Sequence, residues 1–138
     1  MPNDGKIIPQ DRLRVLVIED QPYMRQLIRQ TLERLGIPNI YEAEDGGAGF
    51  KVTIRMRPDI VFCDIHMEPI DGIQYLSQLR QFKNKQIADI PVVFLTSDAQ
   101  EETVIKSKKA AVNGYIVKPT SATKLKENIN RLLGPVLP

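Results

Sequence analysis

The sequence of 138 residues predicts one α/β domain, a doubly wound five-stranded parallel sheet flanked by five helices. Two observations predict this fold class. Short apolar runs alternate five times with longer amphipathic stretches, which is typical of strand–helix units that build a parallel sheet. The apolar runs are also continuous, as expected for strands that helices cover on both faces.

Each strand is expected at one of the short apolar runs. The five runs are residues 13–18, 40–43, 60–63, 91–95 and 114–117. They are rich in Val, Ile, Leu and Phe, which favour buried strands. Residues 12–134 are therefore expected to form the domain, with short tails at 1–11 and 135–138.

The first two helices have clear start and stop signals. Pro22 suits the first position of a helix, and Gly36 with Pro38 ends that helix. Asp45 is a suitable N-cap for the second helix, which three glycines weaken and which stops before Pro58.

The remaining three helices follow the third, fourth and fifth apolar runs. Asp71 is expected to cap the third helix. Ser97, with Gln100 three residues later, fits a capping box for the fourth helix. The fifth helix carries four apolar residues on one face and is closed by Gly134 and Pro135.

The composition argues against several classes of function. The net charge is only +2, and no Lys/Arg cluster carries interleaved aromatic residues, so nucleic-acid binding is not expected. No apolar stretch reaches the length of a membrane span, and we expect a cytoplasmic protein without membrane insertion. The single cysteine, Cys63, lies inside an apolar run and is expected to be a small buried side chain.

Polar residues stand at the ends of four of the five strands. They are Glu19, Asp20, Asp64, Thr96 and Lys118. Ligands of open parallel sheets bind at the carboxyl ends of the strands, so these residues are expected to converge. Carboxylates about 4 Å apart repel each other by about 4 kcal/mol per pair at an effective dielectric near 20. The cluster must therefore take up protons or hold a cation, and its oxygen ligands suit Mg²⁺.

With Mg²⁺ bound, the charges of these residues and the ion sum to zero, and the site can accept a further negative group. A phosphoryl group supplies such a charge. An Asp carboxylate can serve as the nucleophile and form an aspartyl phosphate. The ammonium of Lys118 and the hydroxyl of Thr96 can then bind phosphoryl oxygens.

Four segments in this order resemble the receiver domain of two-component response regulators. They are Glu19-Asp20, the stretch from Asp64 to Gly72, Thr96-Ser97 and Lys118-Pro119. The resemblance covers about residues 12–134 and is greatest to stand-alone, CheY-like receivers. It implies the strand order 2-1-3-4-5 and a cis peptide bond before Pro119. One departure is Glu68, which separates Met67 from the proline that directly follows it in many receivers.

The resemblance implies the roles of the acidic residues. Asp64 would be the phosphoacceptor and a ligand of Mg²⁺. Asp20 would bind the metal directly and Glu19 mostly through water. His66 would offer its backbone carbonyl to the metal.

The resemblance also implies how the phosphoryl group is bound and read. Thr96 and Lys118 would bind phosphoryl oxygens. Tyr115 would be the aromatic switch, which turns inward when Thr96 moves toward the phosphate. His66 and Asp98 would flank the phosphoryl group and tune its hydrolysis.

The implied function is signal relay by a single-domain response regulator. A histidine kinase or phosphotransfer protein would phosphorylate Asp64. The domain would catalyse only its own phosphorylation and dephosphorylation, and it would signal to a protein partner through residues 98–133. Chemotaxis and other phosphorelays are both open as pathways.

Two alternative functions predict different residues at these positions. A pseudo-receiver would bind partners without being phosphorylated, but it usually lacks one of the acids, the Thr or the Lys, and all are present here. An α/β enzyme is the other alternative. A flavin protein should have a phosphate loop after the first strand, where this chain has Glu19 and Asp20. A phosphatase of the Asp-x-Asp type should have a second Asp where this chain has His66.

Overall fold

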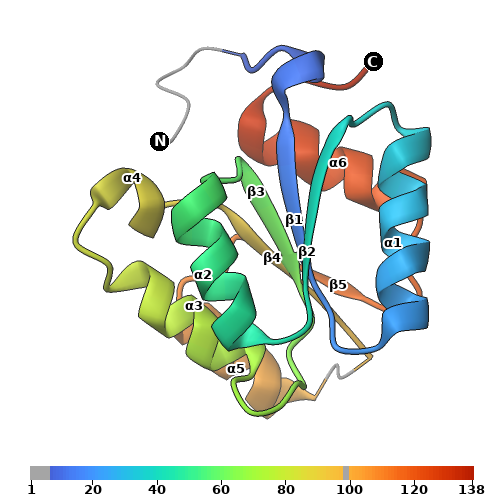
Figure 1. Cartoon of the computed structure of the whole chain (residues 1–138). Coiled ribbons are helices and arrows are strands. Elements are labelled where there is room, and N and C mark those ends of the chain that lie inside the picture. Colours follow the sequence, from blue (N-terminus) through green and yellow to red (C-terminus); the bar gives the residue numbers. More distant parts are fainter. Residues whose placement is uncertain (1–6, 98–99) are drawn as a thin grey trace.

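Five parallel strands form one sheet in the order β2-β1-β3-β4-β5, as predicted. The computed structural model describes residues 7–97 and 100–138 (Figure 1). The strands are β1 (Arg14–Ile18), β2 (Asn39–Ala43), β3 (Ile60–Cys63), β4 (Val92–Thr96) and β5 (Gly114–Val117). The helices are α1 (Pro22–Arg34), α2 (Gly46–Met56), α3 (Gly72–Arg80), α4 (Lys85–Ala88), α5 (Glu101–Lys109) and α6 (Ala122–Leu133). A short 3₁₀ turn, Gln10–Arg12, precedes β1.

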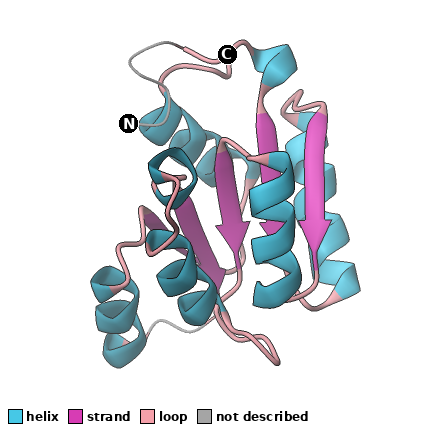
Figure 2. Ribbon diagram, turned by 60° about the vertical axis from the view of Figure 1, so that its left-hand side comes forward, coloured by secondary structure: helices cyan, strands magenta, loops and turns pink. Residues whose placement is uncertain are grey.

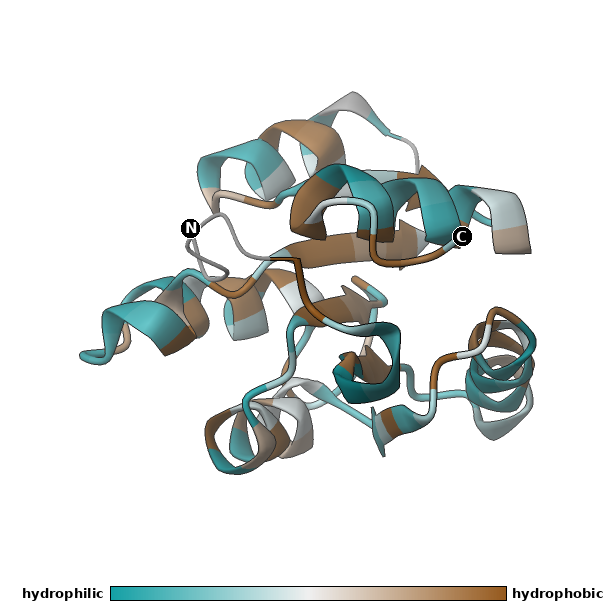
Figure 3. Cartoon of the chain, turned by 90° about the horizontal axis from the view of Figure 1, so that it is seen from above, coloured by the Kyte–Doolittle hydropathy of each residue, from teal (hydrophilic) through white to brown (hydrophobic). Residues whose placement is uncertain are grey.

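Helices cover both faces of the sheet. On one face α1 and α6 contribute Ile28, Leu32, Leu125 and Ile129 to a buried layer with the strands. On the other face α3 contributes a second buried set, which comprises Tyr75, Leu76 and Leu79. Figure 3 shows the apolar strands between helices whose outer sides are hydrophilic. In Figure 2 the strand arrowheads in view point to the same end of the sheet, so the loops after the strands gather at that edge.

The predicted caps of the second and third helices are confirmed. The Asp45 side chain accepts a hydrogen bond from the backbone N–H of Ala48 at 2.9 Å. Asp71 accepts from the N–H of Gln74 at 2.8 Å, and the Gln74 side chain accepts from the N–H of Asp71 at 2.9 Å. This reciprocal pair is a capping box, and it fixes where α3 leaves the loop that follows β3.

The predicted capping box at Ser97 is wrong. Helix α5 begins at Glu101, and its N-cap Gln100 makes no side-chain capping hydrogen bond. Ser97 instead lies in the loop after β4, where it lines a cleft at the sheet edge. Gln100, the residue expected at the third helical position of a box that starts at Ser97, is itself the N-cap.

One further helix, α4, was not predicted. The Asn84 side chain caps it by accepting from the N–H groups of Gln86 and Ile87 at 3.0 and 3.4 Å. Ile87 and Ala88 are buried. A helix of four residues is barely one turn long, so it has no periodic pattern from which it could be predicted.

The C-terminal residues pack against the domain. Val136 and Leu137 are buried in the same layer as α1 and α6. The Asn130 side chain donates to the Leu137 carbonyl at 3.1 Å and accepts from its N–H at 2.9 Å. Within residues 7–97 and 100–138, none of the helices combines the length and the apolar character needed to cross a membrane.

Candidate functional site

The predicted acidic residues meet at the carboxyl edge of the sheet. Glu19, Asp20 and Asp64 each place one carboxylate oxygen within 4.8 Å of the other two. The Lys118 ammonium lies 2.6 Å from Glu19 Oε1 and 3.6 Å from Asp64 Oδ2. Residues 99 positions apart in the sequence therefore form one charged cluster.

The sheet itself positions these side chains. The N–H of Asp64 donates to the Ile18 carbonyl at 2.9 Å, and the N–H of Lys118 donates to the Thr96 carbonyl at 2.7 Å. Glu19 is bound in the same way to the end of β2, through the Ala43 carbonyl at 3.0 Å. The backbone pairing thus continues past the last strand residues, and the charged side chains start from a rigid edge.

The Asp64 carboxylate is held on both oxygens. Its Oδ1 accepts a hydrogen bond from the N–H of Ile65 at 2.8 Å, while its Oδ2 faces Lys118. The residue is only 9% exposed. Its carboxylate therefore has a fixed orientation at the floor of the site.

The charges of the cluster favour a bound cation. The pKa of Asp20 is raised by partial loss of hydration and by its hydrogen bond to and repulsion from Glu19, although Lys118 partly offsets the repulsion. Three carboxylates carry −3 against the +1 of Lys118. The donors are all oxygen atoms, which is the ligand set of a hard divalent ion such as Mg²⁺. The residues present therefore fit a Mg²⁺ site.

A cleft of about 470 Å³ opens above the cluster. It is lined by Asp20, Gln21, Met24, Asp64, His66, Ser97, Lys118 and Pro119. A neighbouring recess of about 650 Å³ shares Asp20 and His66 and continues along the loop after β3. The exposed His66 stands between the two.

The remaining predicted site residues are Thr96, Tyr115 and Asp98. Thr96 is fully buried at the end of β4. Tyr115 lies in β5, where it is half-buried and packs against the layer that contains α3. Asp98 lies outside the described residues, so its predicted role in hydrolysis stays a prediction. The peptide bond between Lys118 and Pro119 is cis, as the resemblance implied.

Sequence reasoning missed the residues that α1 adds to the site. Gln21 and Met24 line the cleft, and the Arg25 guanidinium donates to the Glu19 carbonyl at 2.7 Å. Their signal was position alone, because the first turn of a helix that directly follows an acid pair must lie beside it.

Cys63 does not line the cleft, and its Sγ donates to the backbone carbonyl of Asp64 at 3.0 Å. It is free and fully buried. Burial raises the pKa of the Cys63 thiol well above its usual value, and the neighbouring carboxylates, Asp64 first among them, raise it further. Its predicted role as a small buried side chain is confirmed.

Comparison with known proteins identifies the family. The model of the response regulator receiver domain matches residues 15–130. The chain is 32% identical over 120 residues to the chemotaxis protein CheY-3 of Vibrio cholerae and to the chemotaxis protein CheY of Pseudomonas aeruginosa. These alignments cover 87% of this chain and 91% and 95% of the two relatives.

Solved structures agree. The chemotaxis protein CheY4 of Vibrio cholerae superimposes with a TM-score of 0.79 at 25% identity, over 88% of this chain and 98% of that one. The receiver domain of a signal transduction histidine kinase from Syntrophus aciditrophicus gives 0.79 at 25% identity, over 89% and 91%. CheY-like response regulators are signalling switches rather than enzymes with a turnover substrate. The fold, the acidic cluster and these matches together assign the chain to the family of response-regulator receiver domains, as a CheY-like member.

Proposed function

We propose that this chain is a response regulator that is switched by phosphorylation of Asp64. The observation that carries the proposal is the cluster in which Glu19, Asp20 and Asp64 share oxygens within 4.8 Å while Lys118 contacts two of them. The donor is a histidine kinase or a phosphotransfer protein. The reader is a protein partner, in chemotaxis or in another phosphorelay; the two curated relatives named above are chemotaxis proteins.

The reaction is a transfer to a carboxylate oxygen. An Asp64 oxygen bonds to phosphorus as the P–N bond of a phosphohistidine breaks, and the electron pair of that bond stays on the imidazole nitrogen. The switch is reset by hydrolysis. Water attacks phosphorus and the P–O bond to Asp64 breaks, which returns the carboxylate and releases inorganic phosphate. His66, on the wall of the cleft, and Asp98 tune the rate of this hydrolysis.

The cluster supplies the charge stabilisation for both steps. Asp20, Asp64, Glu19 and the His66 backbone carbonyl would hold Mg²⁺, which would neutralise charge on the phosphoryl oxygens. Lys118 is already within 3.6 Å of Asp64 Oδ2, so its ammonium can bind a second phosphoryl oxygen. The hydroxyl of Thr96 binds a third.

The signal leaves through residues 98–133. Thr96 ends β4 and Tyr115 lies in the paired strand β5, opposite Phe94. By the family resemblance, a movement of Thr96 toward the phosphoryl group lets Tyr115 turn inward. The same region exposes Ile105 of α5 and Val117 of β5 at 45% and 42%, which offers a partner apolar contacts. Phosphorylation shifts a balance between two existing states, because a ligand acts only through its different affinity for each.

The test is intact mass after incubation with acetyl phosphate and Mg²⁺, with and without EDTA. Wild type is expected to gain one phosphoryl group only when Mg²⁺ is present. Asp64→Asn is expected to gain none while keeping the thermal stability of the fold. Phosphorylation of this variant to the wild-type extent would refute the assignment of Asp64.

A pseudo-receiver is the remaining alternative. If wild type gains no phosphoryl group from acetyl phosphate, beryllofluoride with Mg²⁺ separates the two cases. Saturable binding that changes the environment of Tyr115 supports a switch that needs its own donor. No binding supports an interaction module that works without phosphate.

A further inference from the structure

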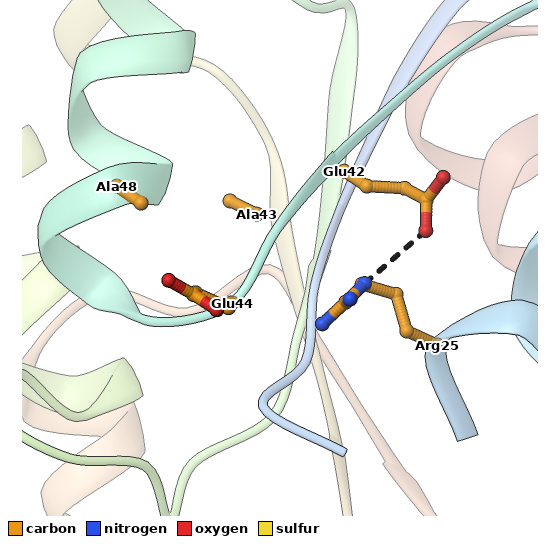
Figure 4. A pocket seen from close by; sticks show the side chains of 5 residues that line it. All are labelled: Arg25, Glu42, Ala43, Glu44 and Ala48. Atoms are coloured by element: carbon orange, nitrogen blue, oxygen red, sulfur yellow. Dashed lines mark hydrogen bonds and ion pairs between the residues drawn. The ribbon is translucent and has the colours of Figure 1, made fainter. Parts of the chain in front are cut away.

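Arg25 of α1 connects the acidic turn to the neighbouring strand. One nitrogen of its guanidinium donates to the Glu19 carbonyl at 2.7 Å. Another, Nε, donates to Glu42 Oε1 at 3.2 Å. Figure 4 shows this ion pair in a recess of about 390 Å³ beside the end of β2. The Arg25 side chain is 20% exposed, so water competes little with these contacts.

The hydrogen bond falls on the peptide unit that places Asp20. The Glu19 carbonyl belongs to the peptide bond between Glu19 and Asp20. Fixing the direction of this carbonyl fixes the plane of the peptide, and with it the direction in which the Asp20 side chain leaves the backbone. On the other side, the N–H of Glu19 is already held by the Ala43 carbonyl at 3.0 Å. Arg25 therefore completes the restraint of the turn between β1 and α1.

The positive charge of Arg25 is expected to weaken the binding of Mg²⁺, whereas its hydrogen bond to the Glu19 carbonyl is expected to favour it. A cation beside an acidic cluster weakens the binding of a further cation by simple repulsion. Glu42 offsets that charge, since it accepts from Arg25 and also from Arg29 at 2.8 Å. Geometry and electrostatics thus predict opposite consequences of removing Arg25, and an experiment can separate them.

We propose that Arg25, held by Glu42, is a positioning residue that orients the Glu19–Asp20 turn for binding Mg²⁺. This inference rests on the proposed function, because it requires that the acidic cluster bind the metal. Groups that orient metal ligands without touching the metal commonly change affinity by about 10- to 100-fold when removed. A residue that acted only through its charge would change affinity in the opposite direction.

The experiment is a titration of the protein with Mg²⁺, followed by the NMR amide shifts of Asp20 and Asp64 and accompanied by thermal melts. Arg25→Gln is expected to weaken Mg²⁺ binding at least about tenfold. Arg25→Lys keeps the charge but offers one nitrogen in place of the two that bind the carbonyl and Glu42. It is expected to bind more weakly than wild type, and more tightly than Arg25→Gln.

Arg29→Gln is the matched control. Arg29 lies one turn further along α1 and shares Glu42, but its other strong contact is the Ile40 carbonyl at 3.1 Å rather than the acidic turn. The control removes the same charge and is expected to bind Mg²⁺ as well as wild type or slightly better.

The outcomes separate the two proposals. If wild type binds Mg²⁺ and Arg25→Gln binds it equally well or more tightly, the proposed function stands and the positioning role is overturned. Equal losses in Arg25→Gln and Arg29→Gln overturn it too, because they indicate a general effect on α1. If wild type itself shows no saturable binding of Mg²⁺, both proposals fail together.

Discussion

At the scale of single residues, the site depends on an ion pair that is almost removed from water. The side chains of Glu19 and Lys118 are 2% and 16% exposed and lie 2.6 Å apart. The sequence predicted that both stand at strand ends and converge. The sequence could not predict which carboxylate Lys118 contacts, because the long side chain of Lys118 reaches both Glu19 and Asp64 from one backbone position.

Lys118→Met tests this pair. The substitution leaves the buried carboxylate of Glu19 without its cation, and breaking a buried pair in this way is expected to lower the free energy of unfolding by up to about 3 kcal/mol. Urea unfolding without Mg²⁺ measures the loss. Lys106→Met is the control, because its pair with Glu102 is exposed and is expected to contribute less than about 1 kcal/mol. Equal effects of the two substitutions would contradict the argument.

Asp59 gives a prediction that depends on pH. Burial raises the pKa of Asp59, although its hydrogen bond from the Arg14 N–H at 2.8 Å and the Arg14 charge act in the other direction. A raised pKa means that the folded state disfavours the ionised carboxylate. The stability contributed by the protonated group is complete below its ordinary pKa of 3.8 and is lost as pH rises through the raised pKa.

Asp59→Asn removes this dependence, because the amide oxygen still accepts from Arg14 but does not ionise. The variant is expected to match wild type at low pH and to become the more stable of the two as pH rises toward about 7. Urea midpoints measured across that range check the prediction. A wild type that becomes the more stable protein at neutral pH would refute it.

At the scale of elements, the predictions succeeded where a local signal is strong. The caps Asp45 and Asp71 are local hydrogen-bonding motifs, and both were found where the sequence indicated. The four-residue α4 was missed because it is too short for a period, and the start of α5 was placed too early because Ser97 and Gln100 match a capping pattern. The N-cap of α5 is Gln100 rather than Ser97.

Gly72→Ala tests the junction of β3 and α3. The N–H of Gly72 donates to the Ile65 carbonyl at 2.8 Å, and an added Cβ would overlap the Asp64 carbonyl oxygen. The backbone must then move, at a cost of about 1–3 kcal/mol, and Asp64 moves with it. We expect both lower stability in thermal melts and slower phosphorylation by acetyl phosphate.

Gly47→Ala is the control for that substitution. The atoms nearest to its added Cβ are a side-chain oxygen of Asp45 at 3.2 Å and a side-chain carbon of Ile70 at 3.7 Å. The better helix propensity of Ala offsets this mild crowding, so the change is expected to stay within about 1 kcal/mol. A larger loss here than in Gly72→Ala would contradict the assignment of the tight contact.

At the scale of the whole molecule, strand order and the meeting of the site residues follow from one property of parallel sheets, that all strand ends lie at one edge. This is why a linear pattern of strand-end residues predicted the acidic cluster. The burial of Val136 and Leu137 was not predictable in that way. Two apolar residues among prolines have no period, and their docking depends on Asn130, six and seven positions earlier.

Deletion of residues 135–138 tests the contribution of this segment. Val136 and Leu137 leave the core, and the Asn130 side chain loses two hydrogen bonds. The deletion is expected to reduce the free energy of unfolding by about 2–4 kcal/mol. Deleting the exposed Pro138 alone is the control and should change stability little. Chemical denaturation compares the three proteins, and equal stability of all three would disprove the contribution.

The pairing of Lys118 with Glu19 has a consequence for the newly made protein. The ribosome releases Glu19, Asp20 and Asp64 long before it adds Lys118, and β5 must then pair with β4 before the ammonium reaches Glu19. Until that moment Glu19 and Asp64 lack their cationic neighbour. On the proposed function, a growing chain lacks the ammonium of the phosphorylation site until β5 has paired with β4.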